Sequence, residues 1–279
     1  MDTLVQIRLV GRTEQADFLA SLLLGAGAQG LEVIDEDTMG QPTNEVEFRV
    51  YHPMETVTDA LAHYKRLLPN DVQITTKILD PSWRDAIEHA EITLGQRFVI
   101  NGCSATQGSR TSIELSLGYG FGDGRHSTTQ ASVCAMEALW DSQIEPQKVL
   151  DLGTGSGVLA LVAAHLGSVV TAVDIEAISR SASAHHASIN GLSHLITVKD
   201  GVPANTRYDL VVANLYFPTL LSLADDFADW LSPGGRCILS GITAKGIKPV
   251  RERFEALGFK HRAAHQIDEW VAWTAQLGE

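Results

Sequence analysis

The chain has 279 residues, of which 44% are hydrophobic, 20% charged and 6% aromatic, a composition that excludes collagen-like and wholly disordered proteins. Its 34 acidic side chains outnumber 21 basic ones, for a net charge of −13, which argues against direct nucleic-acid binding because nucleic-acid binders carry a basic surface. No apolar run reaches the ~20 residues of a membrane span, and the first residues lack the pattern of a secretory signal, so we expect a cytoplasmic protein without membrane association. The three cysteines lack zinc-ligand spacing, so we expect them to be reduced and the protein to bind no metal.

The first 80 residues predict a small α+β domain. Four segments have the alternating or branched apolar pattern of strands, and two segments between them have helical periodicity. The predicted strands are Val5–Val10, Gln29–Ile34, Glu45–Tyr51 and Val72–Ile78, and the helices follow Thr13 and run from Val57 to Leu68. The order βαββαβ is typical of a ferredoxin-like domain over residues 1–80.

Acidic residues outnumber basic ones by 13 to 6 in this first domain. Four of them form a cluster, made up of Glu32, Asp35, Glu36 and Asp37. The cluster is either a contact for a basic partner or simply a solvated loop.

Residues 81–111 predict a bridge to a second domain. Pro81 ends the preceding strand, and Trp83–Glu91 fits a short helix. Arg97–Ile100 and, just past the bridge, Ser112–Leu117 alternate like strands.

Residues 112–279 alternate between strand and helix patterns. Ser127 and Gln130 match a capping box that opens a helix through Trp140. The further predicted helices are Val158–Leu166, Ala177–Asn190, Thr219–Leu231 and Glu252–Leu257, and the strands are Lys148–Leu152, Val169–Val173, Leu195–Val198, Leu210–Asn214, Cys237–Ser240 and Trp270–Ala275. This alternation predicts a doubly wound α/β domain with a mostly parallel sheet and helices on both faces.

A glycine-rich turn after the first of these strands is the most informative stretch. It has the pattern D-x-G-x-G-x-G, formed by Asp151, Gly153, Gly155 and Gly157. Glycine allows a sharp turn and leaves room for a ligand beside the backbone. A dinucleotide fingerprint requires glycine where Val158 stands, and the Lys-Ser/Thr of a P-loop is missing. A cofactor without a pyrophosphate therefore fits the turn better, and we expect Asp151 and the three glycines to contact it.

Asp174 ends the next predicted strand. A carboxylate at this position can accept hydrogen bonds from both ribose hydroxyls of a nucleoside. Its alternative role is that of an ordinary helix cap. Together with the glycine turn, it favours the binding of a nucleoside-containing cofactor.

These features resemble the cofactor site of class I S-adenosylmethionine-dependent methyltransferases, which implies a seven-stranded sheet and S-adenosylmethionine as cofactor. Three further stretches narrow the resemblance: Gly118–Thr129 (GYGFGDGRHSTT), Val211–Leu215 and Leu231–Ile242. With the N-terminal domain, they are similar to the ribosomal protein L11 methyltransferase (PrmA-like) family over nearly the whole chain.

The resemblance implies roles for individual residues and for the domains. Thr129 and Gly153 match cofactor contacts, Asp174 matches the ribose carboxylate, and Asn214 matches the asparagine beside the transferred methyl group. The family methylates lysine side chains and the N-terminal amine of a ribosomal protein that its small N-terminal domain captures. A basic ribosomal protein is therefore the expected partner, and a monomer is compatible with the sequence.

The sequence departs from the family pattern where the acceptor amine is expected. Asp123 replaces a threonine, and Leu215–Pro218 differs from the family's usual residues after Asn214. The run Asn214–Phe217 nevertheless fits the N-x-x-aromatic motif of amino-group methylases. We expect the Asn214 amide oxygen to hold the acceptor amine and Phe217, or Tyr216, to line the lysine side chain. We expect His126 to have a structural role or to cover the cofactor, with proton transfer as the alternative.

Three other functions remain open from the sequence. A methyltransferase of this fold could act on another protein lysine or on a small amine. A non-catalytic protein could retain the cofactor fold. A nicotinamide-dependent oxidoreductase would be indicated by stabilisation with NADH but not with S-adenosylmethionine.

Overall fold

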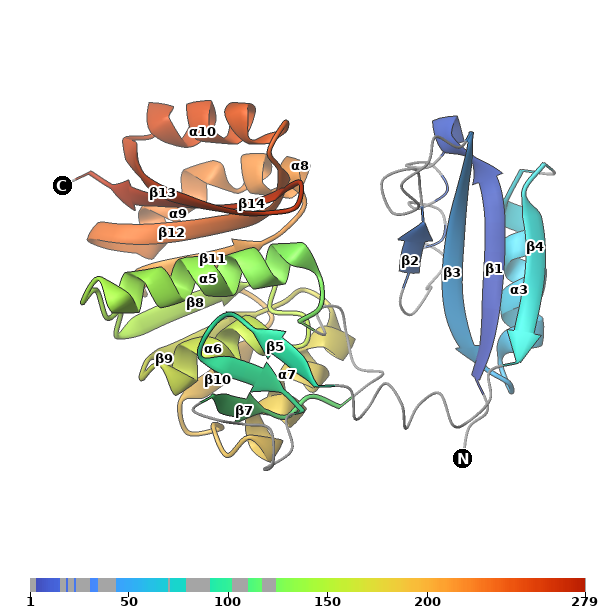
Figure 1. Cartoon of the computed structure of the whole chain (residues 1–279), viewed down its shortest axis with the longest axis horizontal. Helices are drawn as coiled ribbons and strands as arrows, with labels where there is room; N and C mark the ends of the chain where they lie inside the picture. Colours follow the sequence, from blue (N-terminus) through green and yellow to red (C-terminus); the bar gives the residue numbers. More distant parts are fainter. Residues whose placement is uncertain are drawn as a thin grey trace. The chain divides into compact units, whose positions relative to one another are not determined.

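The computed structural model describes residues 4–15, 19, 23, 31–34, 44–69, 71–78, 91–101, 110–116 and 124–278. The chain divides into two compact units, Met1–Ile87 and Glu88–Glu279 (Figure 1). The predicted helix Trp83–Glu91 lies almost wholly outside the described residues, as do Asp35–Asp37 and the position of Asp123. The domain boundaries at residues 80 and 111 remain predictions.

The N-terminal unit contains a four-stranded antiparallel sheet in the order β2-β3-β1-β4. Alternate residues of β1, namely Val5, Ile7 and Leu9, are buried in its core, while Arg8, which lies between Ile7 and Leu9, is exposed. The elements are β1 (Leu4–Arg12), β2 (Leu31–Ile34), β3 (Glu45–Pro53), α3 (Val57–Leu67) and β4 (Gln73–Ile78). Leu19 and Leu23 are helical and buried in the same core. The predicted strands are present; the complete ferredoxin-like domain remains a prediction.

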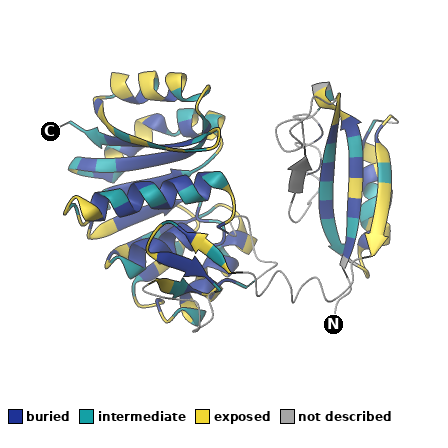
Figure 2. Cartoon of the chain, in the orientation of Figure 1, coloured by how far each residue is buried: buried dark blue, intermediate teal, exposed yellow. Residues whose placement is uncertain are grey.

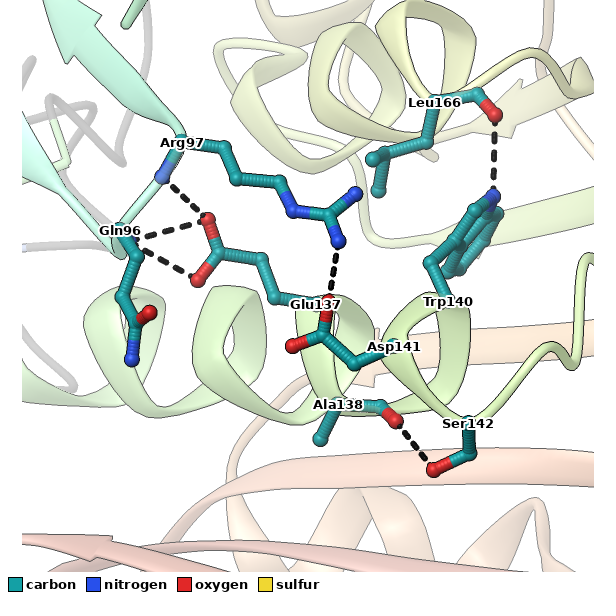
Figure 3. Close-up of polar contacts among 8 residues, drawn as sticks. All are labelled: Gln96, Arg97, Glu137, Ala138, Trp140, Asp141, Ser142 and Leu166. Carbon is teal, nitrogen blue, oxygen red and sulfur yellow. Dashed lines mark hydrogen bonds and ion pairs between the residues drawn. The ribbon is translucent and has the colours of Figure 1, made fainter. Parts of the chain in front are cut away.

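A small three-stranded sheet opens the second unit. It consists of β5 (Ile92–Leu94), β6 (Phe98–Ile100) and β7 (Thr111–Ile113), in that order. The β5–β6 turn is held by Glu137, whose buried carboxylate accepts the backbone N–H groups of Gln96 and Arg97 at 2.8–3.0 Å (Figure 3). The Arg97 guanidinium pairs with Asp141 on the same helix as Glu137. This sheet is therefore fixed to that helix.

The rest of the second unit is a seven-stranded sheet in the order β10-β9-β8-β11-β12-β14-β13 (Figure 1). All neighbouring strands are parallel except β14, which is antiparallel to both β12 and β13. The strands are β8 (Lys148–Leu152), β9 (Val169–Val173), β10 (Ile196–Lys199), β11 (Tyr208–Asn214), β12 (Leu231–Thr243), β13 (Phe259–Ile267) and β14 (Trp270–Leu277). The prediction of a doubly wound, mostly parallel sheet is confirmed.

Helices cover both faces of this sheet. One apolar cluster contains Leu210 and Val212 of β11 with α5–α7, and the other contains Val211 and Ala213 with α8–α10. The helices are α5 (Ser127–Asp141), α6 (Val158–His165), α7 (Ala177–Ile189), α8 (Phe217–Ser222), α9 (Ala224–Trp230) and α10 (Ile247–Ala256). Because both faces are covered, the central strands are buried continuously (Figure 2). Within the described ranges, no helix is long and apolar enough to cross a bilayer.

The predicted start of α5 is wrong by one residue. His126, not Ser127, is the N-cap, and its side chain accepts the backbone N–H of Thr128. Ser127 instead donates to Asp268 at 2.6 Å, and the Gln130 amide donates to two backbone oxygens outside the helix. The capping-box residues are thus used for tertiary contacts.

Three further predictions on the C-terminal half need correction. The last helix, predicted over Glu252–Leu257, already begins at Ile247. The single helix Thr219–Leu231 is two short helices, α8 and α9, that meet at Leu223. The strand predicted over Cys237–Ser240 already begins at Leu231 and continues to Thr243. Leu231 pairs with Tyr208 of β11, the register shifts past the glycines, and from Arg236 on the strand pairs with both β11 and β14.

Candidate functional site

The glycine turn joins β8 to α6 at the carboxyl end of the parallel strands. Gly153, Gly155 and Gly157 all have positive φ, at 73°, 53° and 86°. A Cβ on Gly153 would lie 2.3 Å from Leu215 Cδ2, and one on Gly157 would lie 3.1 Å from Ser183 Cα. The positive φ favours glycine at both positions, and Leu215 and Ser183 fill the space that a Cβ would take. The result is a turn whose backbone is not covered by side chains of its own.

Asp151 stabilises the turn from inside the protein. Its side chain is 1% exposed, and Oδ2 accepts hydrogen bonds from Thr154 Oγ1 at 2.6 Å and from the Ala160 N–H at 3.1 Å. Burial raises the pKa of Asp151 to about 6, and the nearby charge of Asp174 adds to this rise, against the two hydrogen bonds. The structure thus shows how Asp151 holds the turn, and the cofactor contact predicted for this residue stays a prediction.

Asp174 joins the glycine turn to the start of α7. Its Oδ2 accepts the Gly155 N–H at 3.0 Å, and its Oδ1 accepts the Glu176 N–H at 2.9 Å. The side chain is only partly buried. Each carboxylate oxygen has a second lone pair, so it can accept a further hydrogen bond from a ligand. The helix-cap role is present, and it leaves capacity for the predicted ribose contact.

Asn214 lies at the end of β11, next to the glycine turn. The preceding residue, Ala213, pairs with Leu152 at the end of β8. Asn214 Nδ2 donates to Thr128 Oγ1 at 3.1 Å and to Thr129 Oγ1 at 3.5 Å. Two residues predicted for the site from distant motifs, Thr129 and Asn214, are therefore in contact.

The two aromatic residues after Asn214 have different environments. Phe217 begins α8 and packs, partly buried, against the apolar cluster below that face of the sheet. Tyr216 is 70% exposed. The ring of Tyr216 is therefore the more exposed of the two, and the substrate contact predicted for Phe217 stays a prediction.

Sequence reasoning missed two residues that organise the site. Thr128 lies beside the expected Thr129; its hydroxyl accepts from Asn214, and its backbone oxygen accepts from Ser240 Oγ at 3.1 Å. The paired threonines in the motif could have signalled this role. The site also depends on a buried histidine of α7, His186, to which the sequence analysis assigns no function.

His186 connects the glycine turn to the strand segment before α5. Its Nε2 accepts the backbone N–H of Ser116 at 3.1 Å, so the proton is on Nδ1, which donates to the Ser156 carbonyl at 2.7 Å. Burial lowers the pKa of His186 and favours this neutral form. Its position on a helix gave no sequence signal of this contact.

The geometry fits a nucleoside ligand that carries positive charge. Gly153 and Gly155 are partly exposed in the turn, Asp174 offers free lone pairs, and the buried carboxylate of Asp151 makes the site electronegative. No basic residue lies in the turn between Asp151 and Val158 to neutralise a phosphate. The donor set therefore suits an adenosyl sulfonium better than a phosphorylated nucleotide.

Relatives of this chain carry one name. A "Ribosomal protein L11 methyltransferase" of Listeria monocytogenes is 35% identical over 172 residues, which cover 60% of this chain and 54% of the relative. One of Brucella abortus is 35% identical over 168 residues, covering 57% and 59%. The chain thus matches little more than half the length of these curated relatives.

A solved structure and a family comparison agree with these relatives. The ribosomal protein L11 methylase of Lactobacillus delbrueckii subsp. bulgaricus has a TM-score of 0.61 and 26% identity, covering 68% of this chain and 99% of the other. Residues 3–277 match the family described as "Ribosomal protein L11 methyltransferase (PrmA)". The chain therefore belongs to the ribosomal protein L11 methyltransferase (PrmA) family.

Proposed function

We propose that this chain is an S-adenosylmethionine-dependent protein N-methyltransferase that methylates lysine side chains and the N-terminal amine of ribosomal protein L11. The observation that carries the proposal is the contact between Asn214 and Thr129 beside a glycine turn with three positive φ angles. Family membership and the names of the relatives support the substrate. We place the reaction in the cytoplasm, where ribosomal proteins are made.

The residues of the turn would hold the cofactor by its nucleoside. The backbone of Gly153, Gly155 and Gly157 would lie against it, Asp174 would accept hydrogen bonds from the ribose hydroxyls, and Thr129 would be a further contact. When bound, the cofactor supplies an activated methyl group on a positively charged sulfur. Asp151 would contribute a buried negative charge within the turn, which favours a cationic ligand.

The acceptor half of the site would select and orient a neutral amine. A free lysine has a pKa of about 10.4, and a pocket with little water and a nearby positive charge lowers it. Asn214 Oδ1 accepts a hydrogen bond from the amine, so that the nitrogen lone pair points at the methyl group. Tyr216 or Phe217 lines the apolar part of the lysine. Positioning therefore supplies most of the rate, and no general base is needed.

We further propose that residues 1–80 bind the protein substrate and that residues 112–279 carry out the transfer. The excess of acidic residues in the first segment supports an interaction with a basic protein. The bridge over residues 81–111 would connect the two functions.

The test is methyl transfer from labelled cofactor to purified ribosomal protein L11, with sites read by mass spectrometry. The proposal predicts label on lysines and on the N-terminal amine, and its loss in Asn214→Ala. Label on other proteins of a lysate, with none on L11, would indicate a different acceptor. Cofactor binding without transfer to any amine would indicate a non-catalytic protein.

A further inference from the structure

We propose that His126 is a positioning residue that fixes the orientation of the Asn214 side-chain amide through the hydroxyl of Thr128. The inference rests on the proposed methyl transfer and adds a residue that touches neither cofactor nor acceptor. It follows from the direction of three hydrogen bonds at the start of α5.

The first step is the protonation state of the His126 ring. His126 is the N-cap of α5, and its Nδ1 lies 3.3 Å from the Thr128 backbone nitrogen and 2.8 Å from Thr128 Oγ1. A backbone N–H can only donate, so Nδ1 is an acceptor and the ring proton is on Nε2.

The second step is the direction of the Thr128 hydroxyl. A hydroxyl has one proton, and the 2.8 Å contact directs that proton to Nδ1. Thr128 Oγ1 can then only accept from Asn214 Nδ2, which lies 3.1 Å away. Thr128 is 5% exposed, and its backbone oxygen accepts from Ser132 and Ser240, so the residue has little freedom to rearrange.

The third step is the amide of Asn214. Its nitrogen faces the threonines, so Oδ1 faces the opposite direction, and none of the hydrogen bonds described for Asn214 uses Oδ1. Oδ1 is the atom that must accept from a substrate amine. A reversed amide would present its NH₂ group to the amine and would place two acceptor oxygens, Asn214 Oδ1 and Thr128 Oγ1, against each other. His126 therefore favours the productive orientation.

The ring of His126 is itself held by the β13–β14 turn. It packs edge-on against Trp270, with ring centroids 5.1 Å apart. The next residue, Ser127, donates to Asp268 of the same turn. The sheet edge thus fixes the imidazole in the position that the hydrogen-bond chain requires.

The test compares two substitutions at one position. His126→Ala removes the acceptor, whereas His126→Asn retains it, because an asparagine at an N-cap accepts the same backbone N–H. We expect His126→Ala to lower kcat about tenfold while the Kd for cofactor changes less than about twofold, and His126→Asn to restore most of kcat. Thr128→Val should resemble His126→Ala.

Ser142→Ala is the matched control, because it removes a hydrogen bond to Ala138 at the other end of α5 (Figure 3). If His126→Ala lowers kcat no more than this control, or if His126→Asn restores nothing, the inference is wrong.

A second measurement does not depend on turnover. Long-range ¹H–¹⁵N spectra of the wild-type protein at neutral pH should show Nδ1 of His126 as the unprotonated nitrogen. A proton on Nδ1 would overturn the inference even in an active enzyme. If the wild-type protein methylates no amine although Nδ1 is unprotonated, the proposed function fails and the hydrogen-bond arrangement stands.

Discussion

The cofactor half and the acceptor half of the proposed site are built in different ways. The cofactor half is held by backbone conformation and by two carboxylates, Asp151 and Asp174, that bind backbone N–H groups. The acceptor half is held by a chain of side chains that ends at Asn214, beside the exposed Tyr216. Changes in the first half should therefore alter cofactor affinity and stability, and changes in the second should alter turnover.

The largest effect should come from removing the Asn214 amide. Asn214→Ala removes the proposed acceptor for the substrate amine, and we expect kcat to fall about 100-fold or more. Cofactor affinity should fall much less, because the glycine turn is unchanged. Single-turnover transfer at saturating cofactor, together with calorimetric binding, measures both values. Unchanged turnover would exclude this role for Asn214.

Gly153→Ala tests the conformational basis of the cofactor half. Its positive φ costs about 1–2 kcal/mol for any other residue, and the new Cβ would overlap Leu215. We expect cofactor Kd to rise about 50-fold and the unfolding free energy to fall by about 2–3 kcal/mol. Gly201→Ala is the control, because no atom lies within 4 Å of a Cβ there. Equal effects of the two substitutions would contradict the argument.

Asp174→Ala separates cofactor affinity from turnover at the carboxylate that we propose binds the ribose. Loss of hydrogen bonds to a charged group costs about 1.5–3 kcal/mol, so we expect cofactor Kd to rise about tenfold or more. At saturating cofactor kcat should stay within about threefold. Asp229→Ala, at an exposed carboxylate of α9, should leave Kd unchanged. A selective fall in kcat with normal Kd would place Asp174 in the acceptor half instead.

The smallest expected effect is the contribution of Asp151 to the pH dependence of the unfolding free energy. Because the pKa of Asp151 is raised to about 6 in the folded protein, its contribution to stability is complete below pH ~4 and is lost as the pH rises through 6. The unfolding free energy of wild type relative to Asp151→Asn should be about 1 kcal/mol higher at pH 5 than at pH 7. Urea unfolding of both proteins at pH 5 and pH 7 measures this difference. His186 contributes equally to the two proteins, so its contribution cancels. A difference of opposite sign would mean that Asp151 is ionised more readily than usual.

The sequence predicted the centre of the large sheet better than its edge. The bounds of β8 and β9 agree with prediction because central strands buried on both faces are continuous apolar runs. The edge strand β13 was missed, since most of its side chains from Lys260 to Gln266 are exposed or only partly buried and leave no apolar pattern. The three-residue strand β5 was too short to give a signal.

In the site, too, the features set by neighbouring residues were predicted, and those set by contacts between distant segments were not. The glycine turn was predictable because its backbone conformation demands glycine within a few residues. The start of α5 was not, because both His126 and Ser127 can cap a helix. A hydrogen bond from Ser127 to Asp268, 141 residues away, decides between them. Such contacts between distant segments are not encoded in any local pattern.

The carboxylate of Glu137 has a consequence for where the second unit can be cut. It is 4% exposed, and the turn that satisfies it lies 40 residues earlier in the chain (Figure 3). A fragment that began at residue 112 would keep Glu137 and lose its N–H partners, leaving an unsatisfied charge inside the protein. An autonomous version of this unit must therefore start upstream of Ile92, so that β5 and β6 are retained.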